Sequence, residues 1–358
     1  MRHSRRRARR VGVLLFAVLP ALAAADDAFQ WSGFAIARGT SGAKAPLDAD
    51  PLSGQLQLGL DWSNSPKLTL HLGLLARTDA DDTEHGYAGT PEAYVESDLR
   101  HGANRFKLRA GAFFLPTSRE NVDALWENPY TISSSALNTW FGQELRPIGI
   151  DASYLRGGAR IGATLFRGND TFGALPVDLG WSLSDRWALL GQDTPTAFDF
   201  YSSVSAETDH RLGYSARAGW SATNFSVLFT HIDNRADALP HGEYYNWGTR
   251  FEVLGFDASL GDWTLAGEGG WGPTTIKVSG VEFRSDLRAA YLLGSRRFRR
   301  HRVSLRIDWY RGGRQDGEAL TLAYFWTPPG HASLGCEFLA TNDTARAILQ
   351  LRYGFARR

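Results

Sequence analysis

The chain has 358 residues, of which 12% are aromatic, 38 are glycine, one is methionine and one is cysteine. The single cysteine, Cys336, excludes a disulfide framework and any metal site built from several cysteines. After residue 25 no segment approaches 18 consecutive apolar residues, so the sequence predicts no transmembrane helix there. An aromatic-rich and glycine-rich chain without long apolar runs is typical of a transmembrane β-barrel, in which apolar and polar residues alternate.

The first 25 residues have the three-part layout of a secretory signal peptide. Residues 1–10 are cationic, residues 11–22 are apolar, and three alanines follow at 23–25. A retained membrane anchor is the alternative, but the apolar stretch is short for a span. Removing this segment lowers Lys plus Arg from 39 to 33 against 38 Asp plus Glu, so the net charge changes from +1 to −5. The remaining domain, 26–358, is therefore not expected to bind nucleic acid.

The hydrophobic period along this domain is two, which indicates strands with one apolar face. Segment 67–77 reads KLTLHLGLLAR and segment 345–355 reads ARAILQLRYGF. Tilted strands of roughly nine to eleven residues are long enough to cross a bilayer. Sixteen such segments are predicted, at 29–38, 53–62, 67–77, 92–100, 105–114, 144–154, 159–167, 211–220, 224–232, 244–256, 263–271, 282–293, 302–310, 318–326, 331–340 and 345–355.

The predicted connectors alternate between short turns and long loops, which is the arrangement of outer-membrane barrels. An even number of strands places both termini on the short-turn side, the periplasm. The segment 198–208 resembles a strand but is assigned to a loop. The long loops are expected at 39–52, 78–91, 115–143, 168–210, 233–243, 272–281 and 311–317.

Aromatic residues favour a barrel over a soluble β-sandwich, which would also show alternation. They are predicted to gather at both ends of the outward face, as in the two aromatic girdles of membrane barrels. Trp62 and Trp220 represent one girdle, and Tyr245, Trp247 and Trp271 the other. The prediction is an all-β, transmembrane antiparallel β-barrel of about 16 strands, with short periplasmic turns and long external loops, in the cell outer membrane.

The last predicted strand is similar to the terminal strand of outer-membrane barrels, which ends in an aromatic residue and carries another two residues earlier. Here these residues are Tyr353 and Phe355 in AILQLRYGF at 347–355. The sequence departs from that pattern because Ala356, Arg357 and Arg358 follow the final aromatic.

Three further stretches resemble Gram-negative outer-membrane porins of the phosphate-selective type and their relatives. They are RAGAFFLPTSREN at 109–121, HIDNRAD at 231–237 and YYNWGTRFEVLG at 244–255. The resemblance implies a sixteen-stranded porin that is often a homotrimer. Such a barrel is expected to contact outer-membrane lipid and lipopolysaccharide, to be inserted by the barrel-assembly machinery and to pass small hydrophilic solutes.

Charged side chains are expected to face a wet lumen, because an Arg or Lys facing lipid at mid-depth costs about 2–4 kcal/mol. Arginine dominates the predicted inward cations and can bind carboxylate or phosphate with two hydrogen bonds. The hypothesis is a mild preference for anions, and the alternative is that cations and acids pair across strands and cancel. The predicted pore-lining residues are Lys107, Arg109, Arg160, Arg217, Arg250, Arg284, Arg288, Arg302, Arg306, Arg352, Asp151, Glu252, Glu268 and Asp308.

Two long loops carry mixed charge and tryptophan. The loop 115–143 is interpreted as a constriction loop folded into the lumen, with Arg119, Glu120, Asp123 and Glu127 near the narrowest point. The alternative is an external loop packed against a neighbouring subunit. The loop 168–210, with Trp181 and Trp187, is interpreted as a folded cap or a subunit contact, and ligand stacking on those rings is less favoured.

The function predicted from these features is passive diffusion of small hydrophilic solutes or ions. The alternatives are a dedicated exporter of an acidic polysaccharide, an outer-membrane barrel enzyme, and a structural barrel without an open pore. No GxSxG, HExxH or P-loop motif occurs, and the nine histidines show no metal-ligand spacing. We therefore expect no enzymatic activity, no cofactor and no metal.

Overall fold

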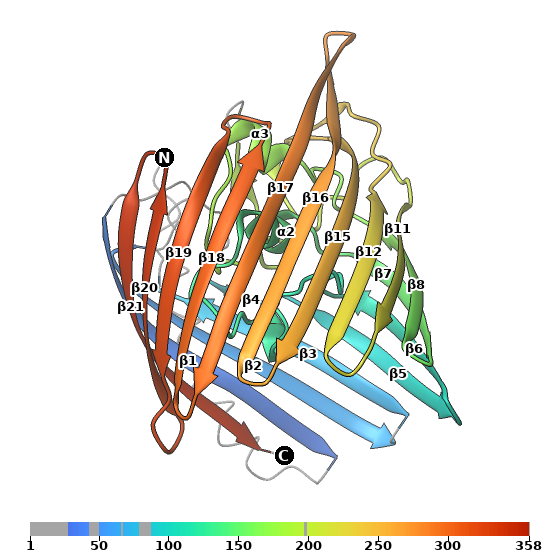
Figure 1. Cartoon of the computed structure of the whole chain (residues 1–358). Coiled ribbons are helices and arrows are strands. Elements are labelled where there is room, and N and C mark those ends of the chain that lie inside the picture. Colours follow the sequence, from blue (N-terminus) through green and yellow to red (C-terminus); the bar gives the residue numbers. More distant parts are fainter. Residues whose placement is uncertain (1–27, 43–49, 66, 79–86, 197–198, 358) are drawn as a thin grey trace, which may run out of the picture.

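The described part of the chain forms a closed, antiparallel β-barrel of sixteen long strands (Figure 1). The two-residue strand β4 (Ala88–Gly89) is paired to this sheet as well. The predicted fold class is therefore confirmed. Among the described residues, no helix is both long and apolar enough to cross a membrane. The predicted signal peptide, 1–25, lies outside those residues. The computed structural model describes residues 28–42, 50–65, 67–78, 87–196 and 199–357.

The barrel strands pair in chain order, and the barrel closes where β1 pairs with β21. Each is a run of alternating exposed apolar and inward residues, as the period of two predicted. The strands are β1 (Phe29–Gly42), β2 (Leu52–Ser65), β3 (Leu68–Arg77), β5 (Ala93–His101), β6 (Asn104–Ala112), β7 (Ile148–Arg156), β8 (Ala159–Arg167), β11 (Gly213–Ser221), β12 (Phe225–Asp233), β15 (Gly248–Leu260), β16 (Trp263–Val278), β17 (Val281–Phe298), β18 (His301–Arg311), β19 (Gly317–Trp326), β20 (Ala332–Thr341) and β21 (Ala345–Arg357).

Short turns close the hairpins at one end of the barrel, and most long connections leave from the other end. The predicted loop 272–281 is wrong, because β16 and β17 continue through it and meet at a turn of two residues, Ser279 and Gly280. Both turn residues have positive φ, which suits a tight hairpin. The resulting hairpin projects beyond its neighbours in Figure 1.

Two predicted strands begin later than the sequence pattern suggested. Strand β7 starts at Ile148, because Ala136–Glu144 forms the helix α2. Strand β15 starts at Gly248, because the residues before it enter a small separate sheet. Of the segment 198–208, the described residues 199–208 contribute two residues to that sheet and none to the barrel. The small sheet comprises β9 (Thr194–Pro195), β10 (Tyr201–Ser202), β13 (Pro240–His241) and β14 (Tyr244–Tyr245).

The outer face is apolar and carries exposed aromatic rings toward both ends of the strands. Trp62 and Trp220 are exposed near the short turns, and Trp271 is exposed toward the other end, as predicted. The predicted girdle positions of Tyr245 and Trp247 are wrong. Tyr245 lies in the small sheet, and Trp247 is buried because its backbone binds Asp170 of a loop inside the barrel.

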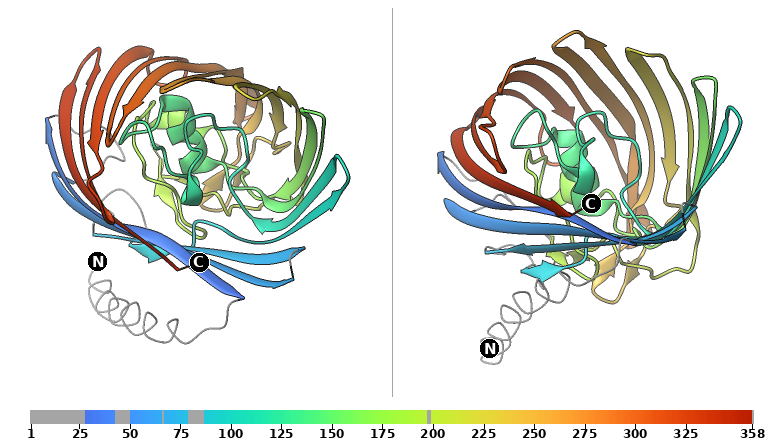
Figure 2. Two further views of the ribbon diagram at one scale, coloured as in Figure 1. Left: turned by 60° about the horizontal axis from the view of Figure 1, so that its bottom comes forward. Right: turned by 90° about the horizontal axis from the view of Figure 1, so that it is seen from below.

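Two long connections, 113–147 and 168–212, fold into the barrel, where Figure 2 shows them enclosed by the ring of strands. The first contains the 3-10 helix η1 (Ala124–Trp126) and α2, and the second contains α3 (Ala174–Asp178). Every residue of α2 is buried. Trp140 of this helix stacks on Phe172 with the ring centroids 4.6 Å apart, and it packs edge-on against Phe251 of β15 with the centroids 4.9 Å apart. The lumen therefore holds an apolar core of its own.

Candidate functional site: a cavity in the barrel lumen

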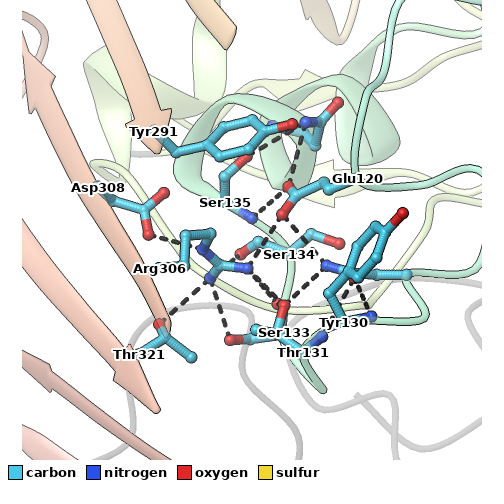
Figure 3. Close-up of polar contacts among 12 residues, drawn as sticks. Glu120, Tyr130, Thr131, Ser133, Ser134, Ser135, Tyr291, Arg306, Asp308 and Thr321 are labelled. Atoms are coloured by element: carbon cyan, nitrogen blue, oxygen red, sulfur yellow. Dashed lines mark hydrogen bonds and ion pairs between the residues drawn. The ribbon is translucent and has the colours of Figure 1, made fainter. Parts of the chain in front are cut away.

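Arg306 of β18 holds the first inserted loop in place (Figure 3). Its guanidinium donates to the carbonyl oxygens of Ser133 at 2.6 Å and Ser134 at 3.0 Å. It also forms ion pairs with Glu120 of the loop at 3.1 Å and with Asp308 of its own strand at 2.8 Å. All three charged side chains are fully buried. Such a cluster is stable only if each charge is paired, so the loop and the wall depend on one another.

Carboxylates from three strands accept hydrogen bonds from residues at or just before the start of α2. Glu337 of β20 accepts from the Ile132 N–H at 2.6 Å, and Asp308 accepts from the Ala136 N–H at 3.2 Å. Glu268 of β16 accepts from the Asn138 side chain at 2.7 Å. The first turn of a helix has free N–H groups and a partial positive charge, which anionic side chains stabilise. Glu268 and Asp308 thus face inward, as predicted, but they anchor the loop and do not line water.

Arginines from other strands hold the second inserted loop. Arg38 of β1 donates to both carboxylate oxygens of Asp185 at 2.7 Å, and to Gln350 of β21 at 2.7 Å. Arg77 of β3 donates to the carbonyl of Trp187 at 2.7 Å, and Arg346 of β21 donates to a backbone carbonyl of the same loop. Desolvation acts to raise the pKa of the half-buried Asp185, but the neighbouring Arg38 outweighs it and lowers that pKa below its ordinary value. This part of the loop is therefore fixed against the wall formed by β1 and β21.

A cavity of about 440 Å³ remains between the inserted loops and this wall. Its lining runs from the β17–β18 turn, at Arg299 to His301, to Asp185 well inside the barrel. The strands contribute Phe34, Gln57 and Gln350 among others, and the first loop contributes Asp123 and Glu127. We refer to this space as the lumen cavity. Polar side chains of the wall and of both inserted loops surround this open space.

Opposite charges face one another across the lumen cavity. Glu127 accepts two hydrogen bonds from Arg352 of β21, at 2.9 Å and 2.6 Å. Burial nevertheless raises the pKa of Glu127 above its ordinary value, against the influence of Arg352. The guanidinium of Arg302 of β18 lies over the ring of Tyr130, 4.9 Å from its centroid, and the exposed Asp123 also lines the cavity. The structure thus brings together four predicted residues: Asp123, Glu127, Arg302 and Arg352.

The other two predicted constriction residues lie elsewhere. Glu120 is fully buried beneath the loop, where it also accepts from the Ser135 N–H at 2.6 Å. Arg119 is directed to the inner wall, where it pairs with Asp257 of β15 at 3.2 Å. The loop folds Arg119 and Glu120 against the wall, so of the four predicted constriction residues only Asp123 and Glu127 line the lumen cavity.

Five further predicted residues face inward on the wall of β6, β7, β8 and β11. Lys107 and Arg109 both pair with Glu96 of β5, at 2.6 Å and 2.7 Å, and remain partly exposed. Arg217 and Asp151 form a buried ion pair, and Asp151 also accepts from Thr164 at 2.7 Å. Arg160 has no hydrogen-bond or ion-pair partner among the described residues, and other arginines surround it.

Four predicted pore-lining residues are on the outward face instead. In β15, Arg250 pairs with Asp233 at 3.2 Å, and Glu252 lies 2.6 Å from His231. In β17, Arg284 pairs with Asp286, and Arg288 stands beside the exposed Trp271. The reason is the apolar filling of the lumen. Apolar inward residues pack against α2 or against Tyr130 of the same inserted loop, so the charged residues that alternate with them must face outward. Those inward residues are Phe251 and Val253 of β15 and Leu287, Ala289, Tyr291 and Leu293 of β17.

Sequence reasoning missed the pair of Arg38 and Asp185. The predicted strand 29–38 has apolar residues at both alternating sets of positions, so its pattern does not say which way Arg38 points. Asp185 lies in a long loop for which periodicity gives no orientation. Only the mutual contact of two distant segments reveals the pair.

Comparison with known proteins gives no match to a family model and none to a curated protein sequence. Solved structures do match. OmpT, an outer membrane protein of Vibrio cholerae, in its trimer form, has a TM-score of 0.58 at 9% identity, covering 91% of this chain and 99% of that one. OmpF of Salmonella typhi in complex with daunomycin has a TM-score of 0.57 at 11% identity, covering 91% and 97%.

A porin refined at 1.8 Å resolution matches with a TM-score of 0.52 at 12% identity, covering 91% of this chain and 100% of that one. By its fold the chain is an outer-membrane β-barrel. The predicted location is confirmed at this level. Likeness at such low identity shows the fold alone, so the phosphate-selective subtype stays a prediction.

Proposed function

We propose that this barrel is a porin that lets small hydrophilic solutes or ions diffuse through the lumen cavity. The observation that carries the proposal is the lining of that cavity. Amide and hydroxyl groups such as those of Gln55, Gln57 and Ser333 line it together with charged groups of both signs. Such a lining can replace the water of a passing solute without holding one ion strongly.

The path is narrow, because the inserted loops bury the inward side chains of the opposite strands. Passage of small solutes is favoured over export of a polysaccharide for the same reason. Many charges also cancel in pairs, as Arg352 does with Glu127 and Arg38 with Asp185. A mild preference for anions remains part of the proposal, since the cavity lining contains more arginine than acid. We propose transport without enzymatic activity.

Single-channel conductance of refolded residues 26–358 in planar bilayers, under a potassium chloride gradient, tests the pore. We expect small ohmic steps and a reversal potential that indicates anion preference. Asp185→Ala should enlarge the steps because it frees the loop from Arg38. The matched control Asp343→Ala, at the exposed turn between β20 and β21, should leave them unchanged. No conductance from verifiably folded protein would contradict the proposal.

We also propose that the barrel assembles as a homotrimer. The support is the fold likeness to OmpT of Vibrio cholerae, whose structure is described as a trimer form. Light scattering on detergent-extracted protein should give three times the mass of the chain. A monomeric mass at all concentrations would contradict this assembly. Contacts with lipopolysaccharide and with the barrel-assembly machinery stay predictions.

A further inference from the structure

The β17–β18 hairpin carries the sequence Arg296-Arg297-Phe298-Arg299-Arg300-His301-Arg302 at the short-turn end of the barrel. Arg297 and Arg302 are directly opposite each other in the strand register, and both line the lumen cavity. Arg299 and Arg300 of the turn line it as well. Like charges directly opposite on neighbouring strands destabilise the pair unless an anion lies between them.

The counter-charges in the cavity do not satisfy this group. Of the three acids in the lining, Glu127 is paired with Arg352 and Asp185 with Arg38. Only Asp123 remains; it lies near enough to Arg302 and Arg352 to attract them, but it forms no ion pair of hydrogen-bonding length among the described residues. Arg302 donates a long hydrogen bond of 3.3 Å to the Ser295 hydroxyl and lies over the face of the Tyr130 ring. Arg297, Arg299 and Arg300 have no ion-pair partner in the described part of the chain.

The remaining lining matches a hydroxylated molecule. Phe325 offers an apolar ring, and Ser333 and Thr327 offer hydroxyl groups near the arginine cluster. A volume of about 440 Å³ is within the range of small-molecule sites, about 300–1,000 Å³. Apolar ring faces with surrounding hydrogen-bonding groups suit a sugar ring, and the arginines suit its acidic group, which two guanidinium N–H groups can bind at once.

We propose that the lumen cavity contains a binding site for a small hydroxylated organic anion, a sugar acid or a sugar phosphate. Its acidic group binds between Arg297 and Arg302, and its ring lies toward Phe325 and Ser333. The inference rests on the proposed function, because it names the class of solute that the pore retains during passage. The bound anion relieves the repulsion between the two opposed arginines.

Isothermal titration of the refolded barrel with glucuronate tests the site, with glucose as the neutral probe and glucose 6-phosphate as the phosphorylated one. We expect both anions to bind and glucose to bind at least about tenfold more weakly, since charged hydrogen bonds are lost. Arg302→Gln and Arg297→Gln should each weaken glucuronate binding about tenfold. The matched control is Arg288→Gln, which lies on β17 as Arg297 does but on the outward face. It should bind glucuronate as tightly as the unchanged chain does.

Equal binding of glucose and glucuronate, or an equal loss in Arg288→Gln, would overturn the inference. So would the absence of any binding to a barrel whose folding is verified by its circular dichroism. Single-channel recording separates this failure from failure of the pore. Conductance without any effect of glucuronate refutes the site and leaves the pore, whereas glucuronate binding without conductance leaves the site and refutes the pore.

Discussion

Strands β6 and β15 present opposite kinds of side chain to the lumen. In β6 the inward residues are Lys107 and Arg109, and the outward Phe106 and Leu108 are exposed to lipid. In β15 the inward Phe251 is apolar and fully buried, and the charged Arg250 and Glu252 beside it face outward. Both strands alternate equally well in sequence. We infer that the polar face of a barrel strand points inward only where water can reach the lumen beside it.

The largest effect should come from removing the charge that joins the inserted loop to the packed wall. Arg306→Ala leaves Glu120 and Asp308 buried without their partner, which costs about 3–5 kcal/mol. We expect a large fall in the free energy of unfolding in detergent, cleavage of the loop 113–147 by added protease, and larger single-channel steps. Unchanged unfolding and protease resistance would show that the loop does not depend on this cluster.

The packed wall can be tested through one apolar side chain. Phe251→Ala removes a fully buried ring whose centroid lies 4.9 Å from that of Trp140. It should lower the free energy of unfolding by about 3 kcal/mol. Leu254→Ala, on the exposed face of the same strand, should cost clearly less because it leaves no cavity. Equilibrium unfolding in detergent compares the two variants. Equal losses would mean that the lumen beside β15 is not a packed core.

The second inserted loop should respond to pH through Asp170. Burial raises the pKa of this carboxyl from its ordinary 3.8 to about 6, and the nearby Asp209 and Glu207 add to the rise. The folded protein thus holds the proton more tightly than the unfolded chain. The resulting stability is complete below pH 3.8 and is lost as the pH rises through about 6. In Asp170→Asn the fall of Tm over this interval should become shallower, and an unchanged pH profile would contradict the assignment.

The smallest effect is expected on the wet wall. Lys107 is partly exposed and shares Glu96 with Arg109. Lys107→Ala should therefore lower the free energy of unfolding by less than about 1 kcal/mol. Thermal unfolding of this variant next to Arg306→Ala measures the contrast between the two walls. A loss as large as that of Arg306→Ala would show that charges on both walls support the fold equally.

The sequence predicted the barrel and its strands because alternation and strand length are local properties. It also indicated Asp123, Glu127, Arg302 and Arg352, which the structure brings together in the lumen cavity. It failed for Arg288 because the direction of a strand's polar face depends on what fills the lumen. That filling comes from loops whose apolar residues, such as Trp140, have no periodicity to reveal their partners.

We propose that water and solutes pass through the lumen cavity while the wall under α2 is closed. Two serines test it in a Cys336→Ser background: Ser333 of β20 lines the cavity, and Ser304 of β18 faces the packed interior. Each is changed to cysteine and exposed to a negatively charged, membrane-impermeant thiol reagent during single-channel recording. We expect rapid reaction and a reduced current for Ser333→Cys and neither for Ser304→Cys. Equal reaction at both positions, or reaction at Ser333→Cys with an unchanged current, would contradict it.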